Sequence, residues 1–240
     1  MRYPSIAPDG SQIAFSYMGN LYIVPAAGGG ARLLVSNGSH NTRPVWAPDS
    51  KTIAYASDSK GNFDIYAVSS SGGPSKRLTT HSESELPVSF TPDSKSVLFS
   101  AQRDRSVNNI GFPSRALTEL YKVSIDGASR PIQMLPTPAL NARLDQQGQR
   151  LLYEDWKGVE NEWRKHHISP VARDIWLYDF KAGRHTKLTD FGGEDRNPVW
   201  SADERSVYYL SERSGSFNVW RMPLHASQSQ TGGVIKVPCR

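Results

Sequence analysis

Two stretches of the sequence, at about residues 102–118 and 155–173, have side chains that could bind a ligand. Both contain arginines, and the second also contains lysine, histidine and tryptophan. The forked guanidinium group of arginine binds a carboxylate through two parallel hydrogen bonds. Arginines gathered around an opening could therefore hold the C-terminal carboxylate of a peptide. The candidate residues for binding a peptide carboxylate are Arg43, Arg103, Arg105, Arg164, Lys165 and Arg196. Arg43 and Arg196 shortly precede Pro44 and Pro198, so we expect them to occupy equivalent places in loops that each lead into a strand. The alternative is ordinary surface charge, in which these cations pair with neighbours such as Asp104, Glu160 or Glu162.

Aromatic and histidine residues in the second stretch are candidates for contacts with a ligand or another domain. Trp156 and Trp163 lie outside the sequence repeat that is described below. Large aromatic side chains of this kind commonly anchor interfaces. His166 and His167 lie beside them. Adjacent histidines rarely reach the same metal ion, and no His-x-x-x-His or Cys-x-x-Cys spacing accompanies them. We therefore predict loop contacts here, but no metal site and no cofactor.

Motifs of covalent catalysis are missing from the sequence. A serine nucleophile in a sharp turn between a strand and a helix would carry a Gly-x-Ser-x-Gly motif, which does not occur. The run Gly28-Gly29-Gly30 could suggest a phosphate loop, but such a loop needs a following helix. A strand is expected after these glycines instead, so we predict a hairpin turn and no catalytic residue.

A pattern that recurs five times determines how these side chains are positioned. A turn, most often Pro-Asp, is followed within three to four residues by a short apolar run. The turns are centred on Asp9, Asp49, Asp93, Gln147 and Asp203, 40 to 56 residues apart. Proline presets the backbone of such a turn, and aspartate bonds the amides just ahead of it. Periods of this length are typical of arrays of small sheets.

Each repeat is expected to form four strands. The third strand has a polar, an aliphatic and an aromatic residue in succession, as in Asn20-Leu21-Tyr22 and Asp64-Ile65-Tyr66. Alternation along a strand puts the aliphatic and aromatic side chains on opposite faces, so both faces of the sheet are apolar. We therefore predict an all-β chain, a β-propeller of four-stranded blades with five repeats. The predicted repeats span about residues 3–35, 43–80, 86–133, 138–189 and 196–237 of a single domain.

Bulk composition excludes several other classes. The chain has 240 residues and a formal charge of +5, spread without Lys/Arg runs, which favours solubility over nucleic-acid binding. No stretch approaches the roughly 18 consecutive apolar residues of a membrane span. Cys239 is the only cysteine, so no internal disulfide can form. We expect no signal peptide, because the first repeat begins at Tyr3.

The repeats resemble the WD40-like, Pro-Asp-type propeller repeats of the TolB and tricorn protease group. Longer segments resemble the N-terminal propeller of bacterial tricorn-like serine proteases, and with the repeats the resemblance covers about residues 3–224. These segments are Trp156-Lys157-Gly158, residues 161–167 (Asn-Glu-Trp-Arg-Lys-His-His), Arg173-Asp174-Ile175-Trp176 and residues 193–201 (Gly-Glu-Asp-Arg-Asn-Pro-Val-Trp-Ser).

This resemblance implies a noncatalytic propeller that gates or recognises peptides on their way to or from a separate catalytic domain. Its partners would be peptides and other domains or subunits of a parent serine peptidase, which we expect to be extracytoplasmic, in the periplasm. The family's propeller has six blades, so five repeats and the divergent tail at 227–240 suggest a fragment. A ring of five blades is the alternative.

Two other functions remain open. One is a TolB-like scaffold for protein–protein interaction. The other is an independent propeller enzyme, which would need His, Asp, Glu or Tyr residues clustered around the axis. Whether the chain itself is an enzyme is therefore undecided at this stage.

Overall fold

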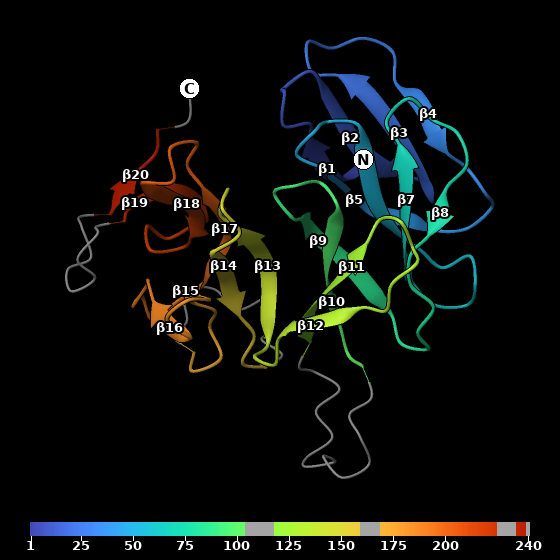
Figure 1. The fold of residues 1–240 in the computed structure, drawn as a ribbon. Coiled ribbons are helices and arrows are strands. Elements are labelled where there is room, and N and C mark those ends of the chain that lie inside the picture. The colour runs from blue at the N-terminus through green and yellow to red at the C-terminus, as the bar shows by residue number, and fades with distance from the viewer. Residues whose placement is uncertain (104–117, 159–168, 225–233, 239–240) are drawn as a thin grey trace. The chain divides into compact units, whose positions relative to one another are not determined.

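The computed structural model describes residues 1–103, 118–158, 169–224 and 234–238. Within these residues the chain forms twenty β-strands in five antiparallel sheets of four strands each, and no helix. Each sheet is a simple meander in which strands that follow one another in sequence are hydrogen-bonded neighbours (Figure 1). The predicted all-β fold, built of four-stranded propeller blades, is confirmed.

The five sheets are named blades 1 to 5 in chain order. Blade 1 contains β1 (Arg2–Ile6), β2 (Gln12–Tyr17), β3 (Asn20–Pro25) and β4 (Arg32–Val35). Blade 2 contains β5 (Asn41–Trp46), β6 (Thr52–Ser57), β7 (Asp64–Ser69) and β8 (Lys76–Arg77). Blade 3 contains β9 (Glu85–Phe90), β10 (Ser96–Ala101), β11 (Glu119–Ser124) and β12 (Ile132–Leu135). Blade 4 contains β13 (Ala139–Leu144), β14 (Arg150–Asp155), β15 (Ile175–Asp179) and β16 (Arg184–Lys187). Blade 5 contains β17 (Asp195–Trp200), β18 (Ser206–Ser211), β19 (Asn218–Pro223) and β20 (Ile235–Lys236).

The recurring Pro-Asp turns connect the first and second strands of their blades. In blade 2 the Asp49 carboxylate accepts a hydrogen bond of 2.9 Å from the amide of Lys51. Ser50, which follows Asp49, has a left-handed backbone with φ of 58°. In blade 3, hydrogen bonds from Thr91 and from the Lys95 amide lower the pKa of Asp93. The turn is therefore held by the aspartate side chain, as the sequence predicts.

Contacts group the chain into two compact units, which are described separately. Unit 1 comprises residues 1–115 and 119–136 and holds blades 1 to 3. Unit 2 comprises residues 116–118 and 137–240 and holds blades 4 and 5. Within unit 1, β5 lies next to both β1 and β9, and within unit 2, β13 lies next to β17. The first strands of successive blades in a unit are therefore neighbours.

Successive blades within a unit bury their apolar faces against each other. The leading face of a blade carries the aromatic pair of its second and third strands, such as Tyr55 and Tyr66 in blade 2, whose rings stack at 5.7 Å. The opposite, trailing face carries small and aliphatic residues such as Ala14 and Leu21 in blade 1. These residues and the Tyr55–Tyr66 pair belong to one buried cluster, so the leading face of blade 2 packs on the trailing face of blade 1.

The same rule applies at the other blade junctions inside the units. Phe99 and Tyr121 of blade 3 stack at 5.7 Å and share a buried cluster with Ala54 and Ile65 of blade 2. In unit 2, Tyr209 of blade 5 is buried with aliphatic residues of blade 4. This burial on both sides explains why successive residues of one strand, which point to opposite faces of the sheet, are both apolar.

Hydrogen bonds supplement this packing in unit 1. The indole of Trp46 in blade 2 donates to the carbonyl of Ser5 in blade 1 at 2.9 Å. The amide of Asp49 donates to the hydroxyl of Ser94 in the corresponding turn of blade 3 at 3.2 Å. The recurring turn residues therefore link neighbouring blades as well as the strands of their own blade.

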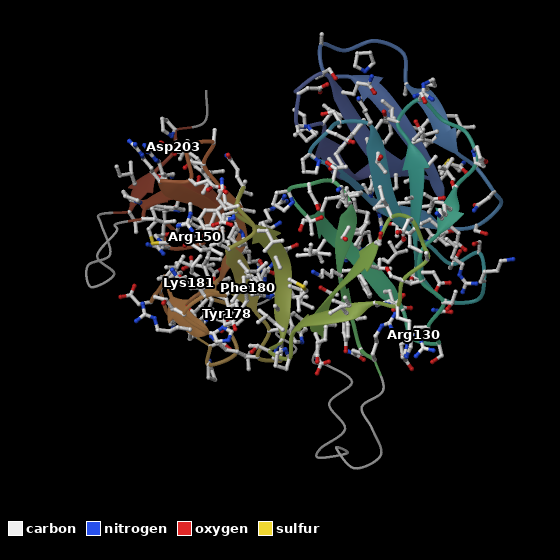
Figure 2. All side chains as sticks on the ribbon, in the orientation of Figure 1. Arg130, Arg150, Tyr178, Phe180, Lys181 and Asp203 are labelled. Carbon is white, nitrogen blue, oxygen red and sulfur yellow. The ribbon has the colours of Figure 1, made fainter. Side chains whose placement is uncertain are left out.

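Unit 2 has its own version of these links. The indole of Trp200 in blade 5 donates to the carbonyl of Arg143 in blade 4 at 3.1 Å. Figure 2 labels Arg150 among the side chains of this unit. Its guanidinium group lies 4.9 Å from the centre of the Trp200 ring and bonds to Asp145 at 2.8 Å. Arg150 also approaches Glu204 of blade 5 at 3.6 Å, so cation–π and ionic contacts cross this junction.

Candidate functional site

A β-bulge with a left-handed residue recurs in the first strands of the blades. Tyr3, Arg43, Asn141 and Asn197 have φ values of 51°, 51°, 48° and 53°, and the strand register shifts beside each of them. A bulge inserts one extra residue and redirects its side chain. Blade 3 has Pro87 at this position, and the proline ring does not permit a positive φ. Four of the five blades therefore turn one side chain of the first strand out of the regular pleat.

Arg43 is the bulge residue of blade 2, and its side chain is exposed. Its guanidinium carbon lies 4.9 Å from the centre of the Tyr3 ring, the bulge residue of blade 1. Among the described residues, no carboxylate lies within the ion-pair distance of 4.0 Å from Arg43. A cation–π contact holds the guanidinium group while leaving its donors open to an incoming anion.

Arg103, another predicted carboxylate-binding residue, is engaged by a carboxylate of the protein. Its guanidinium group donates two hydrogen bonds to Glu85 Oε1, at 2.9 and 2.5 Å. The Glu85 side chain is fully buried, and Arg103 also stacks against the rings of Phe99 and Tyr121. Arg103 therefore forms a structural ion pair that neutralises the buried Glu85 carboxylate.

Arg196 occupies a different place from Arg43, although the sequence suggests that they are equivalent. The register aligns Arg43 with Asn197, so Arg196 precedes the bulge by one residue. Arg196 donates to Glu194 at 2.7 Å and stacks over the ring of Phe217 at 5.0 Å. Both arginines lie within strands and not in the preceding loops, because β5 and β17 begin before them.

An ionic cluster in unit 2 connects Arg196 with Trp156 through Arg173, which sequence reasoning missed. Arg173 donates to Glu154 at 2.9 Å, approaches Glu194 at 3.8 Å and lies 4.8 Å from the centre of the Trp156 ring. The charges of this cluster are therefore satisfied internally.

Backbone donors complete this cluster. Glu154, which is fully buried, accepts a 2.6 Å hydrogen bond from the bulge amide of Asn197 in the next blade. Close by in the sequence, Lys157 bonds to Asp174 at 2.6 Å and approaches Asp155 at 3.3 Å. Burial alone would lower the pKa of Lys157, but the bond with Asp174 and the two acidic charges raise it. These contacts fix the chain on both sides of the segment 159–168.

The other predicted site residues lie outside the described residues. They are Arg105, Trp163, Arg164, Lys165, His166 and His167. Their proposed roles therefore stay predictions. Within the described part of the chain, no group of three or more His, Cys, Asp or Glu side chains is arranged to hold a metal ion. In the same residues, no helix has the length and apolar character needed to cross a membrane.

A family model identifies the chain. Residues 1–232 match the tricorn protease N-terminal beta propeller domain. The chain belongs to this family. The match covers nearly the whole sequence, including the blades that carry Arg43 and Arg173 and the segments whose resemblance the sequence predicted. The predicted resemblance is therefore confirmed.

Solved structures of low sequence identity share the fold of this tricorn-type propeller domain. The tricorn protease superimposes with a TM-score of 0.75 at 20% identity, over 98% of this chain and 22% of that chain. A TolB-type protein from Agrobacterium tumefaciens superimposes with a TM-score of 0.73 at 17% identity, over 97% of this chain and 78% of that chain.

One curated relative, an uncharacterized protein of Agrobacterium fabrum, is 26% identical over 110 residues. That match covers 45% of this chain and 38% of the relative. The chain thus spans well under half the length of this relative, and only about a fifth of the tricorn protease.

Proposed function

We propose that this chain is a noncatalytic propeller module of a tricorn-like serine protease, which recognises peptides for a separate catalytic domain. Membership of the tricorn N-terminal propeller family supports the propeller role. In unit 2, Glu154, Glu194 and Asp174 are paired with cations of the protein, so in this proposal they hold the fold. In this proposal the partners are peptides and the other domains or subunits of an extracytoplasmic parent protease.

The observation that carries the recognition role is the state of Arg43. The structure describes three of the arginines predicted to bind carboxylates. Arg103 and Arg196 are neutralised by Glu85 and Glu194, whereas Arg43 forms no ion pair with a described carboxylate. An exposed guanidinium group held over a tyrosine ring can accept a carboxylate through two hydrogen bonds. A peptide C-terminus, as an exposed and otherwise unpaired carboxylate, fits this donor set.

Binding of matched free and amidated peptides tests the proposal. Short fluorescently labelled peptides of one sequence, with either terminus, are titrated with the 240-residue chain while anisotropy is measured. We expect the free carboxylate to bind about tenfold more tightly, which corresponds to about 1.4 kcal/mol. Arg43→Ala should abolish this difference, and Arg130→Ala, which changes an exposed arginine of blade 3, should preserve it. Equal binding of the two peptides to the parent chain would refute the carboxylate role.

A TolB-like interaction scaffold is the second candidate. The likeness to the TolB-type structure favours it at the level of fold alone. A scaffold would bind a folded partner regardless of terminal amidation. The same titration therefore separates the two functions, because only the first requires a preference for a free peptide carboxylate that is lost in Arg43→Ala.

A further inference from the structure

The leading face of blade 2 carries a row of buried polar side chains at one end of its strands. The row consists of Asn41 of β5, Ser57 of β6 and Asp64 of β7, which the strand register places directly opposite one another. Opposite residues have Cβ atoms about 4.5–5.5 Å apart, so these side chains are neighbours on one face. Ser57 follows Tyr55 by two residues, which puts this polar row on the same face as the stacked tyrosines. All three residues are fully buried.

Each residue of the polar row has a buried oxygen without a hydrogen-bond partner among the described residues. These atoms are Asn41 Oδ1, Ser57 Oγ and Asp64 Oδ1. Arg77 of β8 binds the other carboxylate oxygen, Asp64 Oδ2, at 2.6 Å. Burial raises the pKa of Asp64, and the charge of Arg77 offsets only part of this effect. Because buried polar groups are nearly always paired in native proteins, three unpaired oxygens in one row indicate a bound ligand.

The other blades show what occupies the corresponding place. In blades 3, 4 and 5 a cationic residue follows the counterpart of Ser57 by two positions. These residues are Arg103, Lys157 and Arg213. In blade 5, Arg213 donates to Ser211, the counterpart of Ser57, at 2.9 Å and to Asp195 of the first strand at 3.1 Å. Blade 2 has the neutral Ser59 at this position, so its polar row receives no cation from there.

Blade 4 shows that one carboxylate of such a row can bind two cations. Asp174 is the counterpart of Asp64, and it binds Lys157 at 2.6 Å and Lys187 at 2.9 Å. Lys187 has the position of Arg77 in the register of the third and fourth strands. The Lys157 ammonium lies within 3.3 Å of three protein oxygens. Blade 2 therefore supplies the first of these two cations through Arg77 and leaves the oxygens of the second unpaired.

We propose that the polar row of blade 2 binds a monovalent alkali cation, Na⁺ or K⁺, at the position that the Lys157 ammonium occupies in blade 4. Its protein ligands are Asn41 Oδ1, Ser57 Oγ and Asp64 Oδ1, and oxygen atoms are the ligands that hard cations prefer. A single carboxylate that is already paired with Arg77 favours a charge of +1, because sites for divalent cations usually contain several carboxylates. The ion is structural: it joins three strands of blade 2 and is independent of peptide binding at Arg43.

Thermal unfolding of the 240-residue chain in matched salts tests this proposal. Melting temperatures are measured in NaCl, KCl and tetramethylammonium chloride at equal ionic strength, since the tetramethylammonium ion is too large for the row. An ion that binds only the folded state raises the melting temperature as its concentration increases. We expect a rise of about 3 °C in NaCl or KCl at about ten times the dissociation constant. Identical melting temperatures in the three salts at every concentration would overturn the proposal and would indicate bound water instead.

A pair of equivalent serines separates binding at the polar row from general effects of salt. Ser57→Ala removes one ligand of the ion, and the fold should tolerate it because this hydroxyl has no partner in the described part of the chain. The alkali-dependent rise should be lost in this variant. Ser211→Ala is the matched control in blade 5, where Arg213 fills the corresponding position, and it should keep the rise. A rise that persists in Ser57→Ala, or that disappears in Ser211→Ala, would contradict the site.

Supplying the missing cation within the chain gives the converse test. Ser59→Arg introduces a guanidinium group at the position of Arg103, which lies over the rings of Phe99 and Tyr121 in blade 3. The stacked tyrosines of blade 2 offer the same support. We expect this variant to melt in tetramethylammonium chloride at least as high as the parent in KCl, with no further rise on adding Na⁺ or K⁺. A correctly folded variant, as judged by circular dichroism, that retains the full alkali response would refute the assignment.

Discussion

Replacing Trp46 with alanine should strongly destabilise unit 1, because this indole joins blade 2 to blade 1. The side chain is 7% exposed, and its N–H donates to the Ser5 carbonyl at 2.9 Å. Burying an aromatic side chain removes about 200 Å² of its surface from water. At about 25 cal/mol per Å², the hydrophobic contribution of this side chain to stability is at most about 5 kcal/mol. Leaving the Ser5 carbonyl unpaired adds about 1 kcal/mol. We expect a loss of about 3–5 kcal/mol, the range measured for such truncations.

Two further variants separate packing from hydrogen bonding. Trp46→Phe keeps most of the apolar volume but removes the indole donor, so it should cost about 1–2 kcal/mol. Trp200→Ala truncates the corresponding residue of blade 5, which is only half-buried, and should cost about 2 kcal/mol. Urea unfolding followed by far-ultraviolet circular dichroism gives the free energies. The reasoning fails if Trp46→Ala costs less than Trp200→Ala, or if it shifts the free energy of unfolding by under about 1 kcal/mol.

Two other perturbations test the ionic groups. Arg173→Ala should cost about 3 kcal/mol in urea unfolding, because it leaves the fully buried Glu154 carboxylate without its guanidinium partner; a cost below about 1 kcal/mol would contradict the role of the ion pair. Burial raises the pKa of Asp195 above the ordinary value of 3.8, with Ser211 and Arg213 offsetting part of the effect. The unfolded chain therefore releases this proton at a lower pH than the folded chain, and the contribution of Asp195 to stability falls as the pH rises above 3.8. Asp195→Asn binds no proton at this position, so its free energy of unfolding relative to the parent should increase as the pH rises above 3.8; a pH-independent difference would refute a raised pKa of Asp195.

The sequence predicts the blades well because their determinants are local. The Pro-Asp turn fixes the first hairpin through its own side chain, and alternation of apolar residues specifies two buried faces. The aromatic positions Tyr55 and Tyr66 are neighbours on paired strands, so their recurrence predicts the packing face. These features need no knowledge of distant contacts.

The state of the arginines could not be predicted in the same way, because it depends on partners distant in the sequence. Arg103 is neutralised by Glu85, 18 residues earlier in the chain, and Arg173 by Glu154, 19 residues earlier. The sequence does contain the correct alignment of Arg43. When Pro44 is aligned with Pro198, Arg43 corresponds to Asn197 and not to Arg196. Proline marks this position because it follows the bulge residue in both strands.

The central claim is that Arg43 is available to a ligand, whereas the neutralised arginines hold the fold. The most direct test measures peptide affinity and thermal stability together for Arg43→Ala and Arg103→Ala. The account predicts that Arg43→Ala loses preference for a free carboxylate with an unchanged melting temperature. Arg103→Ala should lower the melting temperature by several degrees, since it leaves Glu85 buried and unpaired, while retaining that preference below the transition. The reverse result, with binding lost in Arg103→Ala and stability lost in Arg43→Ala, would contradict the account.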